Sequence, residues 1–136
     1  MIETARVEEW LYTLLSGDAT LSAIVGSRVY GYVAPAGTTS PWVVFNYQSG
    51  HDVRGMGPAR IMVSAQYQVK AVGQYDGFGM LKSVADRIDA LMQGASGSVV
   101  DGQVLACVRQ SPVAYVEVSD GMQYRHLGGL YWIVVK

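Results

Sequence analysis

The chain has 136 residues, a formal net charge of −1 at pH 7, a single cysteine, and only 15% charged residues. We expect one domain over residues 1–136 with a core that needs no disulfide, and the charge argues against a basic nucleic-acid footprint. The sequence has no apolar run long enough for a membrane span, and its acidic start differs from a signal peptide. We therefore expect assembly in a reducing cytoplasm. Typical soluble domains have roughly 25% charged residues. The lower fraction here favours an oligomer in which part of each subunit's surface is covered by its neighbours.

The N-terminal residues predict two short helices. Residues 3–16 carry apolar side chains at helical spacing, namely Val7, Trp10, Leu11, Leu14 and Leu15. Gly17 then suits a left-handed cap, and Asp18 suits the N-cap of a second helix that ends at Gly26.

Residues 28–33 predict a short strand, and residues 34–41 a loop with two prolines. Aromatic and β-branched side chains at residues 42–48 predict a strand that is partly buried on both faces. Residues 49–59 follow as a loop with three glycines and a proline. Eleven residues exceed an ordinary hairpin turn, so this loop is either a flexible tip or an arm that reaches a partner.

The stretch from residue 60 to residue 94 predicts a central strand followed by a helix. Residues 60–70 alternate strictly, with Ile61, Val63, Ala65, Tyr67 and Val69 on one face. Helical spacing then runs from Phe78 to Met92, and this stripe can pack on the apolar face of the strand. We expect Asp76 to be the N-cap of the helix and Gly94 its C-terminal cap.

The C-terminal third predicts strands. A connector over residues 95–102 includes a brief strand at Val99 and Val100, and residues 103–109 alternate. Pro112 makes residues 113–119 a bent or edge segment. Asp120-Gly121 predicts a hairpin turn, and the last strand, residues 122–136, should bulge or bend at Gly128-Gly129.

These elements predict an α+β fold of two layers. We expect an antiparallel sheet of about four to five strands, with two to three helices packed on one face.

The sequence offers little for chemistry. His51-Asp52 has the composition of a general base, but no nucleophile motif accompanies it, which favours a solvated loop histidine. His126 is expected to be a surface residue or a hydrogen-bonded, half-buried one, and Cys107 a small core residue. Residues 73–79 are rich in glycine but lack the Walker lysine, and no cluster has metal-ligand spacing. We predict no catalytic residue, cofactor or metal.

Tyrosine is abundant, with nine residues spread along the chain. Stacking on unpaired bases would also need a cationic groove, which the sequence lacks. Tyrosine is equally enriched where proteins meet proteins, so we interpret these residues as contact and packing groups.

Three segments resemble the tail completion family of tailed bacteriophages and prophages, the tail terminator or tail-to-head joining proteins. They are the first helix with residues 15–30, then residues 40–47, which match the family's Pro-aromatic-apolar-apolar-Tyr pattern, and lastly residues 63–67 with the helix containing Ala85, Asp86 and Leu91. Residues 102–136 match only as generic strands.

The resemblance implies a structural virion protein rather than an enzyme. Members form a ring, usually a hexamer, that caps the finished tail tube and meets the head-completion or connector protein. DNA passes through the lumen without sequence-specific binding, and the ring is assembled in the host cytoplasm at the head–tail interface. We expect contacts from two loops, through His51, Asp52, Arg54 and Met56 in one and Pro35, Thr38 and Trp42 in or beside the other.

Two alternatives stay open. The chain can be another head–tail connector or minor tail component, which no sequence feature distinguishes. It can also be a small ligand-binding or enzymatic α+β domain, which would need a closed polar pocket around His51 or His126.

Overall fold

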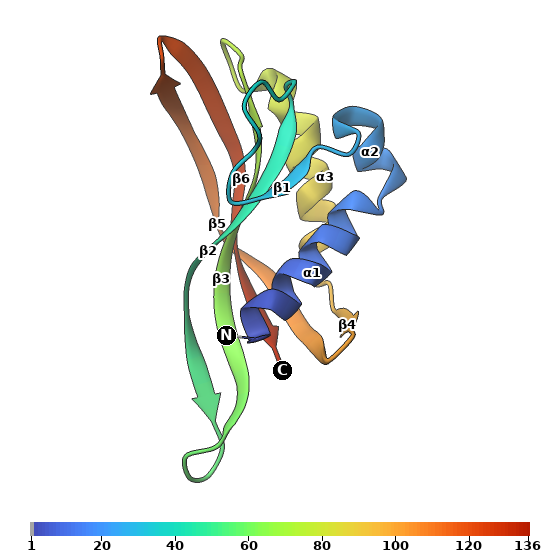
Figure 1. Ribbon diagram of the computed structural model, residues 1–136, viewed down its shortest axis with the longest axis vertical. Helices are drawn as coiled ribbons and strands as arrows, with labels where there is room; N and C mark the ends of the chain where they lie inside the picture. The colour runs from blue at the N-terminus through green and yellow to red at the C-terminus, as the bar shows by residue number, and fades with distance from the viewer. Residues whose placement is uncertain (1) are drawn as a thin grey trace.

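The computed structural model describes residues 2–136, which form a helical layer on one face of a curled sheet (Figure 1). The helices are α1 (Ile2–Ser16), α2 (Ala19–Val25) and α3 (Lys82–Met92), with a 3-10 turn, η1 (Gly79–Leu81), before α3. The strands are β1 (Val29–Gly31), β2 (Trp42–Arg54), β3 (Arg60–Gly73), β4 (Gly97–Val99), β5 (Gly102–Ser119) and β6 (Met122–Val135). The α+β class is confirmed.

The sheet has six strands in the order β1-β2-β3-β6-β5-β4, and it is mixed rather than antiparallel. β1 pairs with β2 in parallel, whereas all other neighbours are antiparallel. The predicted number of strands, four to five, was therefore too low, and the prediction of an antiparallel sheet missed the parallel pair of β1 and β2. β1 and β4 have three residues each, too few for a periodic signal, and the loop after β1 returns the chain far enough to make β2 parallel to it.

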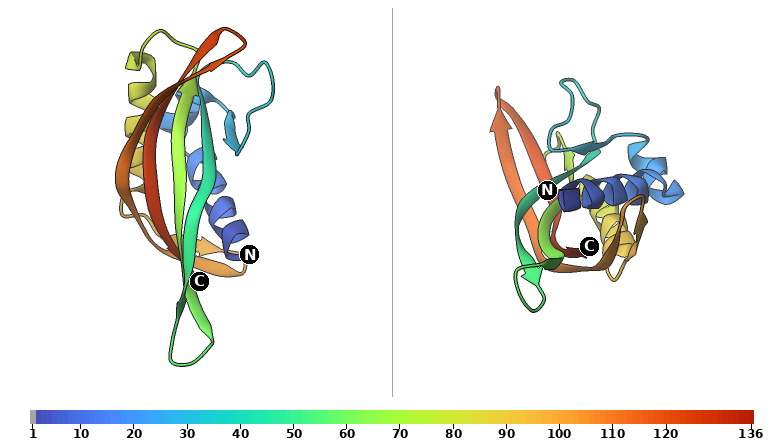
Figure 2. Two further views of the ribbon diagram at one scale, coloured as in Figure 1. Left: turned by 90° about the vertical axis from the view of Figure 1, so that its left-hand side faces the viewer. Right: turned by 60° about the horizontal axis from the view of Figure 1, so that its bottom comes forward.

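All three helices lie on one face of the sheet (Figures 1 and 2). The odd-numbered side chains of β3 and β6 point into the core between the layers. The alternation at residues 60–70 correctly predicts this face from Val63 to Val69, whereas Ile61, at the far end of β3, is 53% exposed. Cys107 is buried in the same core as expected. Its largest fully buried side chains are Tyr67 and Tyr131, which are direct neighbours on β3 and β6.

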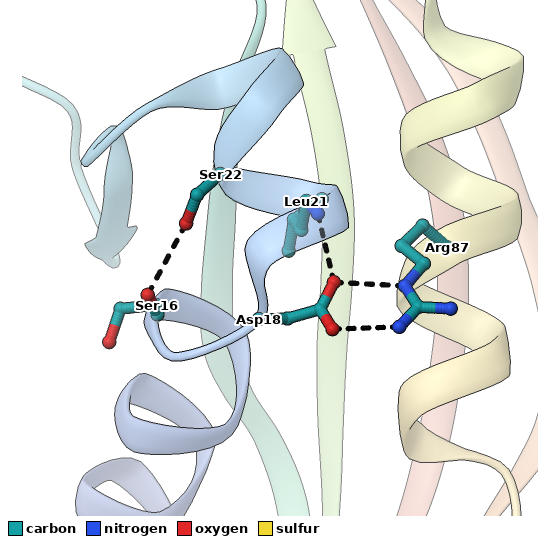
Figure 3. A network of polar contacts seen from close by, with 5 residues as sticks. All are labelled: Ser16, Asp18, Leu21, Ser22 and Arg87. Atoms are coloured by element: carbon teal, nitrogen blue, oxygen red, sulfur yellow. Dashed lines mark hydrogen bonds and ion pairs between the residues drawn. The ribbon is translucent and has the colours of Figure 1, made fainter.

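Asp18, at the start of α2, links this helix to α3 (Figure 3). Its carboxylate accepts a hydrogen bond from the Leu21 backbone N–H at 2.8 Å, which confirms the predicted N-cap of α2. The guanidinium of Arg87 on α3 donates to both carboxylate oxygens, at 2.9 and 2.7 Å. Gly17 does not adopt the predicted left-handed conformation; a Cβ there would lie 2.8 Å from the Thr13 carbonyl oxygen, so close approach explains the glycine.

The segment 49–59 is not a loop. β2 continues to Arg54 and β3 begins at Arg60, so that only residues 55–59 form the tip of a hairpin. Paired strand residues extend far from the helices (Figure 1), and we call residues 49–62 the arm. The glycine and proline content of the segment belongs to its tip, while cross-strand hydrogen bonds order the rest.

Two other predictions were wrong in detail. Asp76 caps no helix, because the chain continues through residues 74–78 to η1, and α3 starts after Leu81 without a side-chain cap. β6 runs unbroken through Gly128 and Gly129, and the two register shifts lie on its partner β5, between Val104 and Ala106 and between Arg109 and Ser111. The turn at Asp120-Gly121 is confirmed, with φ of 53° and 76°, as is the left-handed Gly94 at 76°.

Gly128 is required by the close approach of β3. A Cβ at this position would lie 2.5 Å from the Cα of Lys70 and 2.8 Å from its Cβ. We expect Gly128→Ala to reduce the free energy of unfolding by about 1–3 kcal/mol, the usual cost of overpacking. Urea unfolding measures the loss. Gly77→Ala is the matched control, because a Cβ there meets nothing within 4 Å; equal losses in the two variants would contradict the steric explanation.

The ion pair of Asp18 predicts a pH-dependent stability. The Arg87 guanidinium and the Leu21 N–H lower the pKa of this carboxyl from 3.8 to about 2. A group with a lower pKa in the folded state stabilises the fold above its unfolded pKa and loses that contribution as the pH falls. Asp18→Asn keeps a capping oxygen but removes the charge. We expect it to be less stable than the native chain at pH 7, with the difference closing between about pH 4 and pH 2.

Unfolding of both proteins at each pH measures this difference. Asp76→Asn is the control, since Asp76 has no hydrogen-bond or ion-pair partner within residues 2–136. A difference for Asp18→Asn that stays constant down to pH 2 would assign the effect to capping alone.

Candidate interaction surfaces

The face of the sheet opposite the helices carries a second, smaller apolar cluster. Trp42, Val44 and Val72 are its buried members, and Tyr30, Ala34 and Tyr124 pack against them. The loop from Tyr32 to Thr38 lies beside this cluster. No helix of the described chain covers this face (Figure 2), so the loop is its main cover.

A cavity of about 680 Å³ lies between that loop and the sheet. Aromatic side chains line much of it, and Trp42 and Tyr124 stand with their ring centroids 6.2 Å apart. The cavity is at the end of the sheet where β2 begins, where β3 ends and where the β5–β6 hairpin turns. It is therefore at the opposite end of the sheet from the arm.

Four polar side chains from strands β3, β5 and β6 meet in this cavity, namely Lys70, Tyr115, Glu117 and His126. Lys70 Nζ donates to the Tyr115 hydroxyl at 2.5 Å and to Gln68 Oε1 at 2.9 Å. The Tyr115 ring stacks on the His126 imidazole, with centroids 4.3 Å apart. His126 Nε2 lies 3.1 Å from a carboxylate oxygen of Glu117. Burial, followed by the positive charge of Lys70, lowers the pKa of His126, so the imidazole stays neutral near pH 7.

The arm carries the other group of predicted contact residues. His51, Asp52 and Arg54 lie on the outer half of β2 and are solvent-exposed, and Met56 is fully exposed at the tip. Asp52 Oδ1 lies 3.7 Å from Arg60 Nη1 on the facing strand, an exposed ion pair that adds little stability. These exposed side chains leave the arm free to touch another molecule.

The seven residues predicted to make contacts therefore form two groups. Pro35, Thr38 and Trp42 line the cavity, while His51, Asp52, Arg54 and Met56 belong to the arm. The two groups lie at opposite ends of the sheet and do not form one site (Figure 1).

His51-Asp52 does not form a catalytic pair. Neighbouring residues of a strand point to opposite faces, and Asp52 is directed to Arg60 instead. His126 is more buried than expected, at 7% exposure, and it lies in a cavity rather than on an exposed strand. Within residues 2–136 no group of acidic, histidine or cysteine side chains has a metal-binding arrangement, and no helix is long and apolar enough to cross a membrane.

Sequence reasoning missed Lys70, Tyr115 and Glu117. Lys70 ends an alternating strand on its polar face, which is the pattern of a solvated side chain. Its burial depends on β6 and β5 following β3 in the sheet, and on a loop from the N-terminal third. No local signal in the sequence carries that information.

Residues 9–127 match the family model described as tail completion protein gp17. The chain belongs to this family. The match begins within α1 and ends within β6, and it covers the arm and the residues that line the cavity, so it includes both surfaces described above.

The fold of this tail completion protein is also similar to a chain in a structure titled "Virion of native gene transfer agent (GTA) particle". The two share 19% sequence identity and a TM-score of 0.77, and the alignment covers 98% of each chain. At this identity the likeness establishes the shared fold alone. No curated protein matches the chain in sequence.

Proposed function

We propose that this protein completes the phage tail as a structural, non-enzymatic subunit that terminates the tail tube and joins it to the head-completion complex. The family match over residues 9–127 is the observation that carries this proposal. The whole chain, residues 1–136, acts as one tail-completion domain. It works in the virion at the head–tail interface after assembly in the host cytoplasm.

The sheet supports assembly into a ring. β1 covers only the first part of β2, so the outer edge of β2 has no strand partner along the arm. On the opposite border, β4 pairs with residues 102–104 of β5, and Gly94 and Gln93 bond to Cys107 and Arg109. Within the described chain, residues 110–119 of β5 therefore form a second free edge.

Two different edges on opposite borders of a subunit favour a head-to-tail contact, which closes into a ring when the rotation allows it. Unpaired edges are also templates for strand addition. We propose a ring of six subunits, in which the free edge of β5 contacts the neighbouring subunit. The presence of two unlike free edges on one subunit is the geometric support for a closed ring rather than a two-fold dimer.

The arm and the loop from Tyr32 to Thr38, which borders the cavity, are proposed to contact the tail tube and the connector protein from the two ends of the subunit. Their positions at opposite ends of the sheet suit a protein placed between two neighbours. The net charge of −1 suits a lumen through which DNA passes without being held.

The ring predicts a defined mass in solution. We expect light scattering over a concentration series to show a species of about six times the 14.7 kDa subunit mass, alone or after addition of purified tail tubes. Val118→Lys places a charge on the free edge and should shift the protein to monomers. Val100→Lys is the control, because Val100 is even more exposed but lies in the turn between β4 and β5. A native protein that stays monomeric with and without tubes contradicts the ring.

If the arm contacts a partner, shortening it should impair head–tail joining without impairing the fold. Replacing residues 53–62 with Asn-Gly shortens the hairpin but keeps the pairing of Asp52 with Val63. We expect thermal unfolding to change little, since the removed residues contribute little to the core, while head–tail joining is lost. The measurement is complementation of particles that lack their own copy. Met56→Asn keeps the arm length and separates the role of the tip from that of the strands. Normal joining with the shortened arm would refute its role.

A further inference from the structure

The cavity on the helix-free face contains a buried positive charge without a counterion. Lys70 is 7% exposed, yet none of the ion pairs among residues 2–136 includes it. Its two hydrogen-bond acceptors, Gln68 and Tyr115, are both neutral. Buried charges in proteins are normally paired, because the loss of hydration is otherwise uncompensated. Among the described residues, Lys70 therefore has no carboxylate within ion-pair distance.

Glu117 is not that anion. Its carboxylate bonds to His126 Nε2, and its side chain is 57% exposed at the edge of the sheet. Because a carboxylate only accepts hydrogen bonds, Nε2 carries the imidazole proton. His126 Nδ1 is then a buried acceptor that has no partner within the described residues. Two polar groups of the cluster thus lack a partner among the described residues: the Lys70 ammonium lacks an anion, and His126 Nδ1 lacks a hydrogen-bond donor.

The arrangement of the strands presents two donors together. Gly128 on β6 is paired with Lys70 on β3 and has no side chain. This leaves space for the Lys70 side chain to reach across β6 to Tyr115 on β5. An ammonium has three N–H groups, and two of those on Lys70 are already used. The Tyr115 hydroxyl accepts from Lys70, so its own hydrogen remains free to donate. One N–H and one O–H, 2.5 Å apart at their heavy atoms, match the two oxygens of a carboxylate.

We propose that this cavity binds an aspartate or glutamate side chain from an extended segment of a neighbouring virion protein. The carboxylate pairs with Lys70 Nζ and the Tyr115 hydroxyl, and the segment packs against Trp42 and Tyr124. The cavity volume of about 680 Å³ exceeds one side chain and suits a short peptide segment. The identity of the partner as a virion protein rests on the proposed function, whereas the acidic specificity rests on the cavity alone.

A different protein fits better than a second copy of this chain. Most carboxylates here already have a hydrogen-bond or ion-pair partner, namely Glu3, Glu8, Asp18, Asp52, Asp86, Asp89 and Glu117. Use of one of these by a neighbouring copy would break that contact, which leaves Glu9, Asp76, Asp101 and Asp120 as the acidic side chains without such a contact within residues 2–136.

Selection from a displayed random peptide library, with blocked C-termini, tests the inference on the purified protein. We expect peptides rich in aspartate or glutamate from the native protein, and loss of that enrichment with Lys70→Met, which keeps the apolar stem. Lys82→Met is the matched control, because Lys82 is exposed and pairs with Asp86. Circular dichroism and thermal unfolding verify that both variants fold.

A selected peptide, synthesised with Glu→Gln or Asp→Asn at its acidic position, should bind at least about tenfold more weakly, as expected for a hydrogen bond to a charged group. Tyr115→Phe should weaken the original peptide by a similar factor and supplies a second variant if Lys70→Met is unstable. Equal selection by Lys70→Met and the native protein, or no acidic enrichment on the native protein, would overturn the inference.

Self-association is the competing occupant. If Lys70→Met abolishes the oligomer and selected peptides dissociate it, the cavity binds a second copy and the partner assignment is wrong. The binding measurement uses only purified protein and peptide, so its failure is distinguishable from a failure of the arm or ring experiments.

Discussion

The structure depends on two tyrosines buried side by side at the centre of the sheet. Tyr67 and Tyr131 are paired on β3 and β6, and both are almost completely buried. A buried phenol needs a hydrogen-bond partner, and each of these finds one on a different helix. The Tyr67 hydroxyl bonds to Glu8 and Thr4 on α1, and the Tyr131 hydroxyl donates to Asp89 on α3. Burial raises the pKa of both hydroxyls, which keeps them protonated as donors. The same pair thereby holds both long helices to one face.

Holding the helices on one face leaves the other face of the sheet for different uses. There the covering element is a loop, and a loop does not fill the space above the strands as a helix does. Polar side chains such as Lys70 and His126 consequently end up buried without a full set of partners. The sheet also keeps two partly open edges and an arm that projects from the body (Figures 1 and 2). The proposed role uses several surfaces of this kind, since a ring subunit between tail tube and connector would contact copies of itself and proteins on either side.

The strand at residues 60–70 and the helix after it were predictable because their apolar side chains follow the two periods that backbone geometry imposes. The cap at Asp18 and the turn at Asp120-Gly121 were predictable because both depend on a few adjacent residues. The arm was not. Its residues alternate weakly and contain glycine, so the local pattern favours a loop, whereas β3 itself provides the hydrogen bonds that extend β2. Asp76 is not a cap because α3 begins only at Lys82, after the 3-10 turn η1.

The family, the α+β class and the separation of core from polar residues followed from the sequence by itself, because they depend on composition, short motifs and local periodicity. Strand order, the parallel contact of β1 and the meeting of Lys70, Tyr115 and His126 were decided only by the tertiary structure. The physical reason is distance along the chain. Lys70 and Tyr115 are 45 residues apart, and their contact requires β6 to pair between them with a glycine at the crossing point. Such a contact is the sum of many pairings, and no local sequence pattern encodes it.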